Sequence, residues 1–164
     1  MKKNILCGVA AAALALTACS SSEDPGILAA DPWIRTTAGT ERPDMTALFV
    51  NFTNPGDADV TLIGADCGDV AGMYQLHEMV MVDGEMKMQE VDGGLVVPAG
   101  SHLHLAPGGP HIMLMDLKQD FEVGGEEITC TLEFDNDQTI EVTAPIKEFT
   151  EEQDTYHTHE ASEG

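Results

Sequence analysis

The chain has 164 residues, enough for one ordinary domain with additional terminal segments. It contains 29 acidic residues against 7 basic ones, so its formal net charge at pH 7 is -22. A surface this acidic repels phosphate groups, which argues against nucleic-acid binding.

The N-terminal segment has the features of a lipoprotein signal. Two lysines precede an apolar run over residues 5–16, which is too short to span a bilayer comfortably, and the sequence Leu-Thr-Ala-Cys19 follows. A charged start, an apolar middle and a small-residue exit are typical of a secretory signal, and the ending resembles the bacterial lipobox. We therefore expect residues 1–18 to be removed, Cys19 to be lipidated and residues 19–30 to form a tether on an extracytoplasmic membrane surface. An ordinary signal peptide is the alternative.

Two cysteines remain beyond the lipobox, Cys67 and Cys130. An even pair in an oxidising compartment favours a disulfide. Closing a loop of about 60 residues would stabilise the fold by roughly 4 kcal/mol in the chain-entropy interpretation. A pair of metal-binding thiolates is the alternative, but neither cysteine has another cysteine or a histidine within a few residues.

The region from 31 to 147 is expected to form one β domain. It contains no convincing helical periodicity, and its short apolar or alternating runs are separated by Gly, Pro, Asp and Asn. Seven or eight antiparallel strands in this length predict an all-β sandwich or Greek-key barrel. The acidic segment 148–164 is expected to be a flexible tail. The candidate strands cover residues 45–53, 59–65, 73–82, 85–92, 101–105, 110–117, 127–134 and 138–146.

Seven of the nine methionines fall between residues 73 and 115, although methionine is not favoured in strands. Within this region an Asp-Gly pair at positions 83 and 84 predicts a two-residue hairpin turn. Such a turn would place Met79 opposite Met88, with His77 diagonal to Met88. One face of the predicted hairpin would then carry His77, Met79, Met81, Met86 and Met88.

A second fragment with histidine and methionine follows at His111, Met113 and Met115, which share one side of a predicted strand. Thioethers are soft, neutral ligands that favour Cu(I), and imidazole also binds copper. Calcium and similar hard cations prefer oxygen instead. Two such fragments in one domain favour a copper site; methionines that merely fill the core are the alternative.

These motifs resemble the signature of the bacterial PCuAC copper chaperones. Ten residues separate His77 from Met88, and His111-x-Met113 follows after an interval one residue longer than in the family signature. The resemblance covers about residues 31–146. It implies a cupredoxin-like β-barrel with an exposed Cu(I) site, and delivery of copper to cytochrome c oxidase, often beside a Sco-type partner. The implied ligands are His77, Met88, His111 and Met113, with Met79 and Met86 as alternatives on the same hairpin face.

Two other histidine pairs are weaker candidates. His102 and His104 share a strand face, but they are interpreted as surface residues of an edge strand. His157 and His159 lie in the acidic tail and resemble a short version of the histidine-rich extension that takes Cu(II) in some family members. Weak Cu(II) binding there is an expectation from that resemblance.

Three other functions compete with that of a copper chaperone. An electron-transfer cupredoxin needs a cysteine ligand beside two histidines, and neither Cys67 nor Cys130 is placed to supply one. An enzyme is not expected, because no serine or cysteine lies in a nucleophile motif. A structural or adhesive β-sandwich lipoprotein without metal would explain the anchor and the strands, although not the methionine face. That protein is the main alternative.

Overall fold

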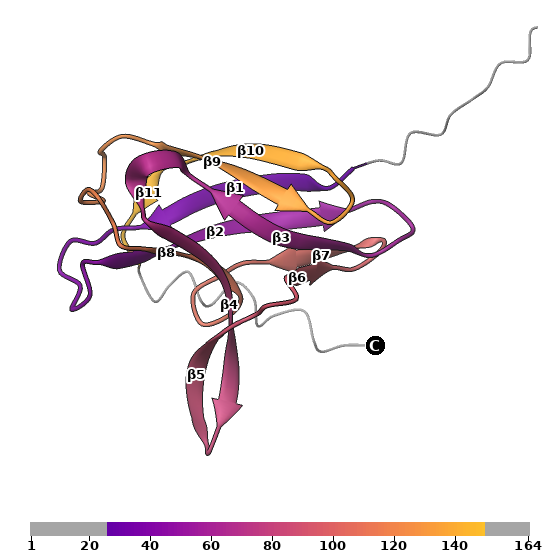
Figure 1. The fold of residues 1–164 in the computed structure, drawn as a ribbon, viewed down its shortest axis with the longest axis horizontal. Helices are drawn as coiled ribbons and strands as arrows, with labels where there is room; N and C mark the ends of the chain where they lie inside the picture. The colour runs from indigo at the N-terminus through magenta and orange to yellow at the C-terminus, as the bar shows by residue number, and fades with distance from the viewer. Residues whose placement is uncertain (1–25, 150–164) are drawn as a thin grey trace, which may run out of the picture.

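The computed structural model describes residues 26–149 (Figure 1). The predicted signal segment 1–18, the lipidation site Cys19 and the tail histidines His157 and His159 lie outside the described residues. Within residues 26–149, no helix is long and apolar enough to cross a membrane.

The described chain consists of strands and one short 3-10 helix, η1, at Gly68–Val70. Most strands are bounded by Gly, Pro, Asp or Asn, as expected for short antiparallel strands. The strands are β1 Leu28–Arg35, β2 Met45–Asn54, β3 Val60–Asp66, β4 Met73–Val82, β5 Glu85–Glu90, β6 Leu95–Val97, β7 Ser101–His104, β8 His111–Met115, β9 Ile128–Phe134, β10 Thr139–Ala144 and β11 Ile146–Lys147.

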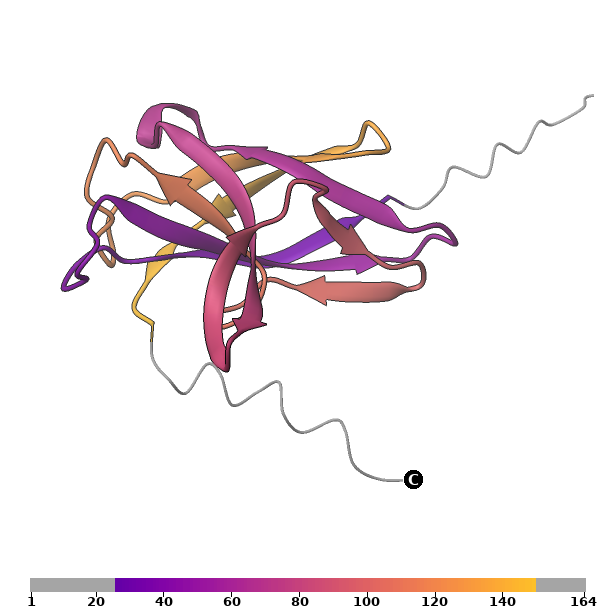
Figure 2. The same cartoon turned by 60° about the horizontal axis from the view of Figure 1, so that its bottom comes forward.

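The strands form two sheets that pack against each other (Figures 1 and 2). The larger sheet has seven strands in the order β11-β1-β2-β8-β4-β5, and β7 pairs with β2 next to the β8 pairing. The smaller sheet has the order β10-β9-β3-β6. All pairings are antiparallel except that of β1 with β11. The predicted all-β sandwich is confirmed.

The number of strands exceeds the predicted seven or eight, because β1, β6 and β11 were missed. β1 begins at Leu28, inside the segment 19–30 that was predicted to be a tether. Its sequence is rich in alanine and includes a proline, and its extended form depends on pairing with β2 across a bulge at Ala30–Trp33. β6 and β11 are only a few residues long. Such elements depend on distant partners, which local patterns do not reveal.

The core between the sheets is built by alternation along the strands. On β2, Leu48, Val50 and Phe52 are fully buried, and Phe52 packs edge-on against Phe134 of the smaller sheet, with ring centroids 5.6 Å apart. Burying each such side chain stabilises the fold by about 1.5–3 kcal/mol. The outward side chains of β2, β4 and β8 are left to form a second face, on the outer side of the larger sheet.

A disulfide joins Cys67, which follows β3, to Cys130 in β9. The pairing expected from the sequence is therefore present in the structure. Both cysteines are buried and belong to the smaller-sheet side of the core.

The β4–β5 hairpin projects beyond the body of the sandwich (Figures 1 and 2). The first half of β4 pairs with β8, whereas its second half has β5 as its only partner among the described strands, and every residue of β5 is exposed. At the turn, Asp83 and Gly84 have φ values of 54° and 84°, the two positive angles required by a type I′ turn. The predicted register, with Met79 opposite Met88, is confirmed.

Candidate metal centre

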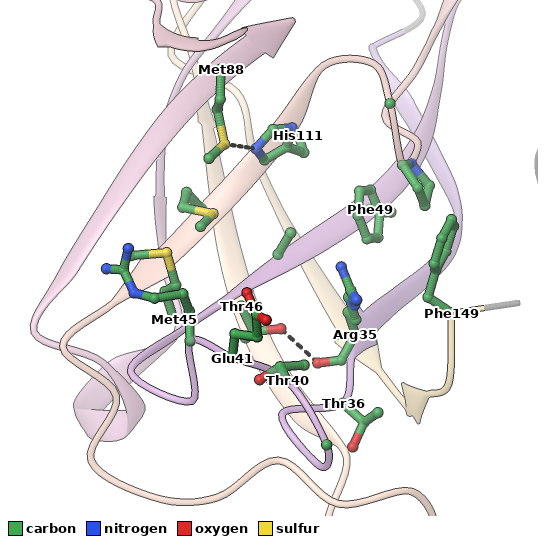
Figure 3. Close-up of a pocket in the computed structure, with 16 residues that line it drawn as sticks. Arg35, Thr36, Thr40, Glu41, Met45, Thr46, Phe49, Met88, His111 and Phe149 are labelled. Carbon is green, nitrogen blue, oxygen red and sulfur yellow. Dashed lines mark hydrogen bonds between the residues drawn. The ribbon is translucent and has the colours of Figure 1, made fainter. Parts of the chain in front are cut away.

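Strand β8 is buried on both of its faces, which is unusual for a strand in an antiparallel sheet. Ile112 and Leu114 point into the core, so His111 and Met113 point to the outer face of the larger sheet. They are nevertheless buried, because the loops that precede β2 and β8 lie over this part of the sheet and line a pocket there with them (Figure 3). The sequence thus places a histidine and a thioether in a shielded position.

His77 reaches the same face from β4. It is the residue at which the projecting hairpin leaves the sheet, because it pairs with His111 on one side and with Glu90 of β5 on the other. The imidazole rings of His77 and His111 are 5.5 Å apart between centroids and nearly perpendicular. Two histidines from segments far apart in the sequence are therefore neighbours.

Hydrogen bonds fix which nitrogen of each ring carries the proton. The Nδ1 of His111 is 2.9 Å from the carbonyl oxygen of Gly109, and the Nε2 of His77 is 3.0 Å from Oε1 of Gln75. Both partners are oxygens that can only accept, so these nitrogens donate. In the neutral rings the other nitrogens, Nδ1 of His77 and Nε2 of His111, therefore carry lone pairs. Nδ1 of His77 is buried and has no hydrogen-bond partner among the described residues.

Met88 completes a cluster of electron-pair donors. Its Sδ lies 2.9 Å from Nε2 of His111 (Figure 3). Because the imidazole proton is on Nδ1, both facing atoms are donors of electron pairs, and a soft cation bound by both would satisfy them. Met113 follows His111 by two residues on the same side of β8, and its side chain lines the same pocket as those of Met88 and His111. The donor set of two imidazoles and two thioethers fits Cu(I).

The surroundings keep both histidines neutral. Burial lowers the pKa of His111, against which its hydrogen bond to Gly109 acts only in part. Burial also lowers the pKa of His77, the neighbouring His111 lowers it further, and Glu90 opposes the shift. Metal binding requires neutral imidazole, so this site does not need to lose protons near pH 7 before it binds an ion.

The pocket beside the cluster has a volume of 570 Å³ and includes residues that the sequence did not single out. Arg35 and Arg42, the only arginines of the chain, both line it, as do Met45 and Phe49. The guanidinium of Arg35 lies 5.3 Å above the ring of Phe149, and Arg42 forms an exposed ion pair with Asp44. Arg35 is on β1 and Met45 and Phe49 are on β2, so they reach the pocket through the pairing of β1 with β2 and of β2 with β8, contacts without a local sequence signal.

The remaining candidate ligands differ in their position relative to His77 and His111. Met79 lies directly opposite Met88, whereas Met86 is two cross-strand pairs closer to the hairpin tip, about 7 Å further from the histidines. His102 and His104 have ring centroids 4.6 Å apart, but they are exposed on β7 and do not line the pocket. Within residues 26–149, no three His, Cys, Asp or Glu side chains form a metal-binding group.

Comparisons with known proteins match the chain to a family of lipoproteins and to solved structures of copper-binding domains. Residues 27–146 match the family model of LpqE-like lipoproteins. A protein of Leifsonia xyli subsp. xyli that is named as a lipoprotein, Lxx21020, is 39% identical over 158 residues, which cover 90% of this chain and 92% of the relative. The Cu(I) form of DR1885 from Deinococcus radiodurans has 28% identity and a TM-score of 0.56, with 79% of this chain and 83% of that chain covered. The copper-bound PCuAC domain of PmoF2 has the same fold, with a TM-score of 0.60 at 24% identity, covering 77% of this chain and 96% of that one.

Proposed function

The chain belongs to the family of LpqE-like lipoproteins and has the fold of PCuAC domains, and from this premise we propose that it is a lipid-anchored, extracytoplasmic copper chaperone. In this proposal it binds one Cu(I) through His77, Met88, His111 and Met113 and passes the ion to another protein. The similarity to the Cu(I) form of DR1885 supports copper as the cargo.

The observation that carries the proposal is the convergence of unprotonated donors. Nε2 of His111 faces Sδ of Met88 at 2.9 Å, and the buried Nδ1 of the adjacent His77 has no hydrogen-bond partner within the described residues. A buried polar atom without a partner costs free energy. A bound soft cation would remove that cost and would also place an attractive centre between the two facing donors.

The chemistry of the four ligands suits a carrier. All four are neutral when they bind, so the ion keeps its single positive charge in the site. Because Met88 is 46% exposed, a partner's ligand can approach the ion from its side while the two histidines still hold it. Copper would leave by ligand exchange, in which each new bond from the partner replaces one from this chain, without a change of oxidation state. The strongly negative chain attracts cations over a longer range.

The proposal also covers the lipid anchor and the protein that receives the copper. Lipidation at Cys19 would hold the domain at an extracytoplasmic membrane surface, as the lipoprotein family suggests. The recipient would be a copper-accepting protein, with cytochrome c oxidase or a Sco-type protein as the candidates implied by the resemblance. Met79 and Met86 are proposed as alternative thioether ligands, and the tail histidines His157 and His159 as a weak Cu(II) site.

Anaerobic titration of the purified protein with Cu(I) against a chromophoric chelator tests the proposal. The parent should bind one tight equivalent, and a His111→Ala/Met113→Ala variant should lose it. Since both residues are buried, a Met88→Leu variant is needed as well: its exposed position should preserve the fold while the affinity falls. Equal binding in all three proteins, or binding no tighter than the chelator, would instead favour a structural or adhesive lipoprotein without metal.

A further inference from the structure

The projecting hairpin carries more thioethers than a single copper site can use. Met79 lies directly opposite Met88, and Met81 lies directly opposite Met86, two pairs closer to the tip. All four share one face of the hairpin, because side chains alternate along a strand and directly opposed residues point to the same side. The two tip side chains are 65% and 52% exposed, respectively.

Packing does not account for the pair at the tip. The hairpin extends beyond the sandwich, and within residues 26–149 no strand pairs with the other side of β5, so Met81 and Met86 contribute little to the core (Figures 1 and 2). Strands favour β-branched and aromatic residues over methionine. The opposite face of the same hairpin has the polar character expected of a solvated strand, since it carries Glu78, Glu85, Lys87 and Gln89 together with Val80 and Val82.

We propose that Met81 and Met86 form a second, weaker Cu(I) site at the tip of the hairpin, through which copper enters or leaves the main site. This inference rests on the proposed function. Directly opposed residues have Cβ atoms about 4.5–5.5 Å apart, so two long thioether side chains can reach one ion between them. The soft, neutral sulfurs select Cu(I) over harder cations, and their exposure leaves the rest of the coordination sphere open to a partner's ligands.

The spacing along the hairpin connects the two sites. The Met81–Met86 pair is two residues, about 7 Å, beyond the Met79–Met88 pair, and Met88 touches His111. The ion would move by stepwise ligand exchange: a bond to a tip sulfur forms as a bond to Met88 or a histidine breaks. The ion remains Cu(I) throughout, and no proton or electron is required.

Methyl-labelled methionine gives a residue-specific test. In an anaerobic NMR titration of the purified protein, the first equivalent of Cu(I) should shift the methyl signals of Met88 and Met113, and a second equivalent should shift those of Met81 and Met86. A Met81→Leu variant keeps the apolar surface but removes one of the two tip sulfurs, and it should lose the second equivalent and retain the first. Met73→Leu is the matched control, because Met73 is also exposed (44%) on β4 but lies at the other end of the strand, opposite Met115. This control variant should still bind both equivalents of Cu(I).

The outcomes separate this inference from the proposed function. Signals of Met81 and Met86 that stay unchanged while those of Met88 and Met113 shift would overturn the tip site and leave the chaperone intact. Shifts at the tip without shifts at Met88 and Met113 would support the tip site and overturn the proposed main site. No response at any of the four would overturn both.

Discussion

His77 on β4 lies directly opposite His111 on β8, and their imidazole rings are 5.5 Å apart between centroids. Each ring donates one hydrogen bond to an oxygen, from Gln75 and Gly109 respectively, so each presents its other nitrogen as an electron-pair donor. The pair occupies the point where the methionine hairpin departs from the sheet. This relationship joins two fragments of the sequence into one candidate site.

Replacement of His77 by alanine should weaken Cu(I) binding. Changes to groups that only orient a metal ligand typically cost 10–100-fold in affinity, so removal of a ligand should cost at least about tenfold. A chelator-competition titration measures the effect. His102→Ala serves as the control, because His102 is exposed on β7 and does not line the pocket. Equal affinities for the two variants would remove His77 from the ligand set.

Gln75→Leu should also weaken binding, although Gln75 is not itself a proposed ligand. Its Oε1 accepts the hydrogen bond from Nε2 of His77 and thereby keeps the lone pair on Nδ1. Without that bond the ring can turn or change tautomer, and we expect a loss of about 10–100-fold in Cu(I) affinity. Gln89→Leu is the matched control on the exposed hairpin face. If both variants bind as the parent does, Gln75 has no positioning role.

The copper-free protein should lose stability on acidification because of its two buried histidines. The pKa values of His77 and His111 are lowered in the folded state, so between those values and the unfolded value of about 6.5 the unfolded chain binds more protons. Stability from these groups is therefore present above pH 6.5 and is lost as the pH falls towards their folded pKa values.

Thermal unfolding from about pH 7.5 to about pH 5.5, a window that includes the ordinary histidine pKa, checks this expectation. A His77→Gln/His111→Gln variant shares every carboxylate with the parent, so the difference between the two proteins isolates the histidines. The parent should lose more stability than the variant over this window. Parallel curves would mean that the folded state does not depress the pKa of either ring.

The local parts of the site could be predicted from the sequence, whereas its assembly could not. The Asp83-Gly84 turn fixes the hairpin register, since a two-residue loop leaves a single pairing, and period-two alternation then places the methionines on one face. The neighbouring position of His77 and His111 depends on β4 pairing with β8, which are separated by three other strands in the chain. The resemblance to a known family supplied that link; the residue patterns alone did not.

The pocket beside the site could not be predicted from the sequence either. Arg35 and Met45 reach it from β1 and β2, and Phe149 comes from the segment after β11, which was predicted to belong to a flexible tail. None of these residues was predicted to belong to the site, and their proximity results from the strand order of the larger sheet. The start of β1 at Leu28 was missed for the same reason, because its pairing with β2 overrides a local sequence that favours a tether.

Gly84→Ala should weaken copper binding indirectly, through the hairpin. Gly84 has a φ of 84°, and no atom of the other described residues lies within 4 Å of the added Cβ, so the cost is backbone strain alone, about 1–2 kcal/mol. Strain at the turn disfavours the register that presents Met88 to His111.

Gly124→Ala is the matched control: Gly124 has a φ of 76° and open space around it among the described residues, but lies in the turn before β9. Both variants should lose similar stability, and only Gly84→Ala should lose Cu(I) affinity. Equal affinity in both would mean that the hairpin does not control the site.

Reduction of the disulfide should destabilise the fold without removing the copper site. Cys67 and Cys130 are 63 residues apart in the sequence, and closing a loop of this size stabilises the folded state by roughly 4 kcal/mol in the chain-entropy interpretation. Both cysteines belong to the side of the core formed by the smaller sheet, whereas the candidate ligands lie on the outer face of the larger sheet. We therefore expect a Cys67→Ala/Cys130→Ala variant to unfold at a lower denaturant concentration than the parent. Under conditions in which the variant is folded, it should still bind one equivalent of Cu(I) with the affinity of the parent. A loss of copper binding in the folded variant would instead assign the two cysteines to the metal site, as the thiolate alternative requires.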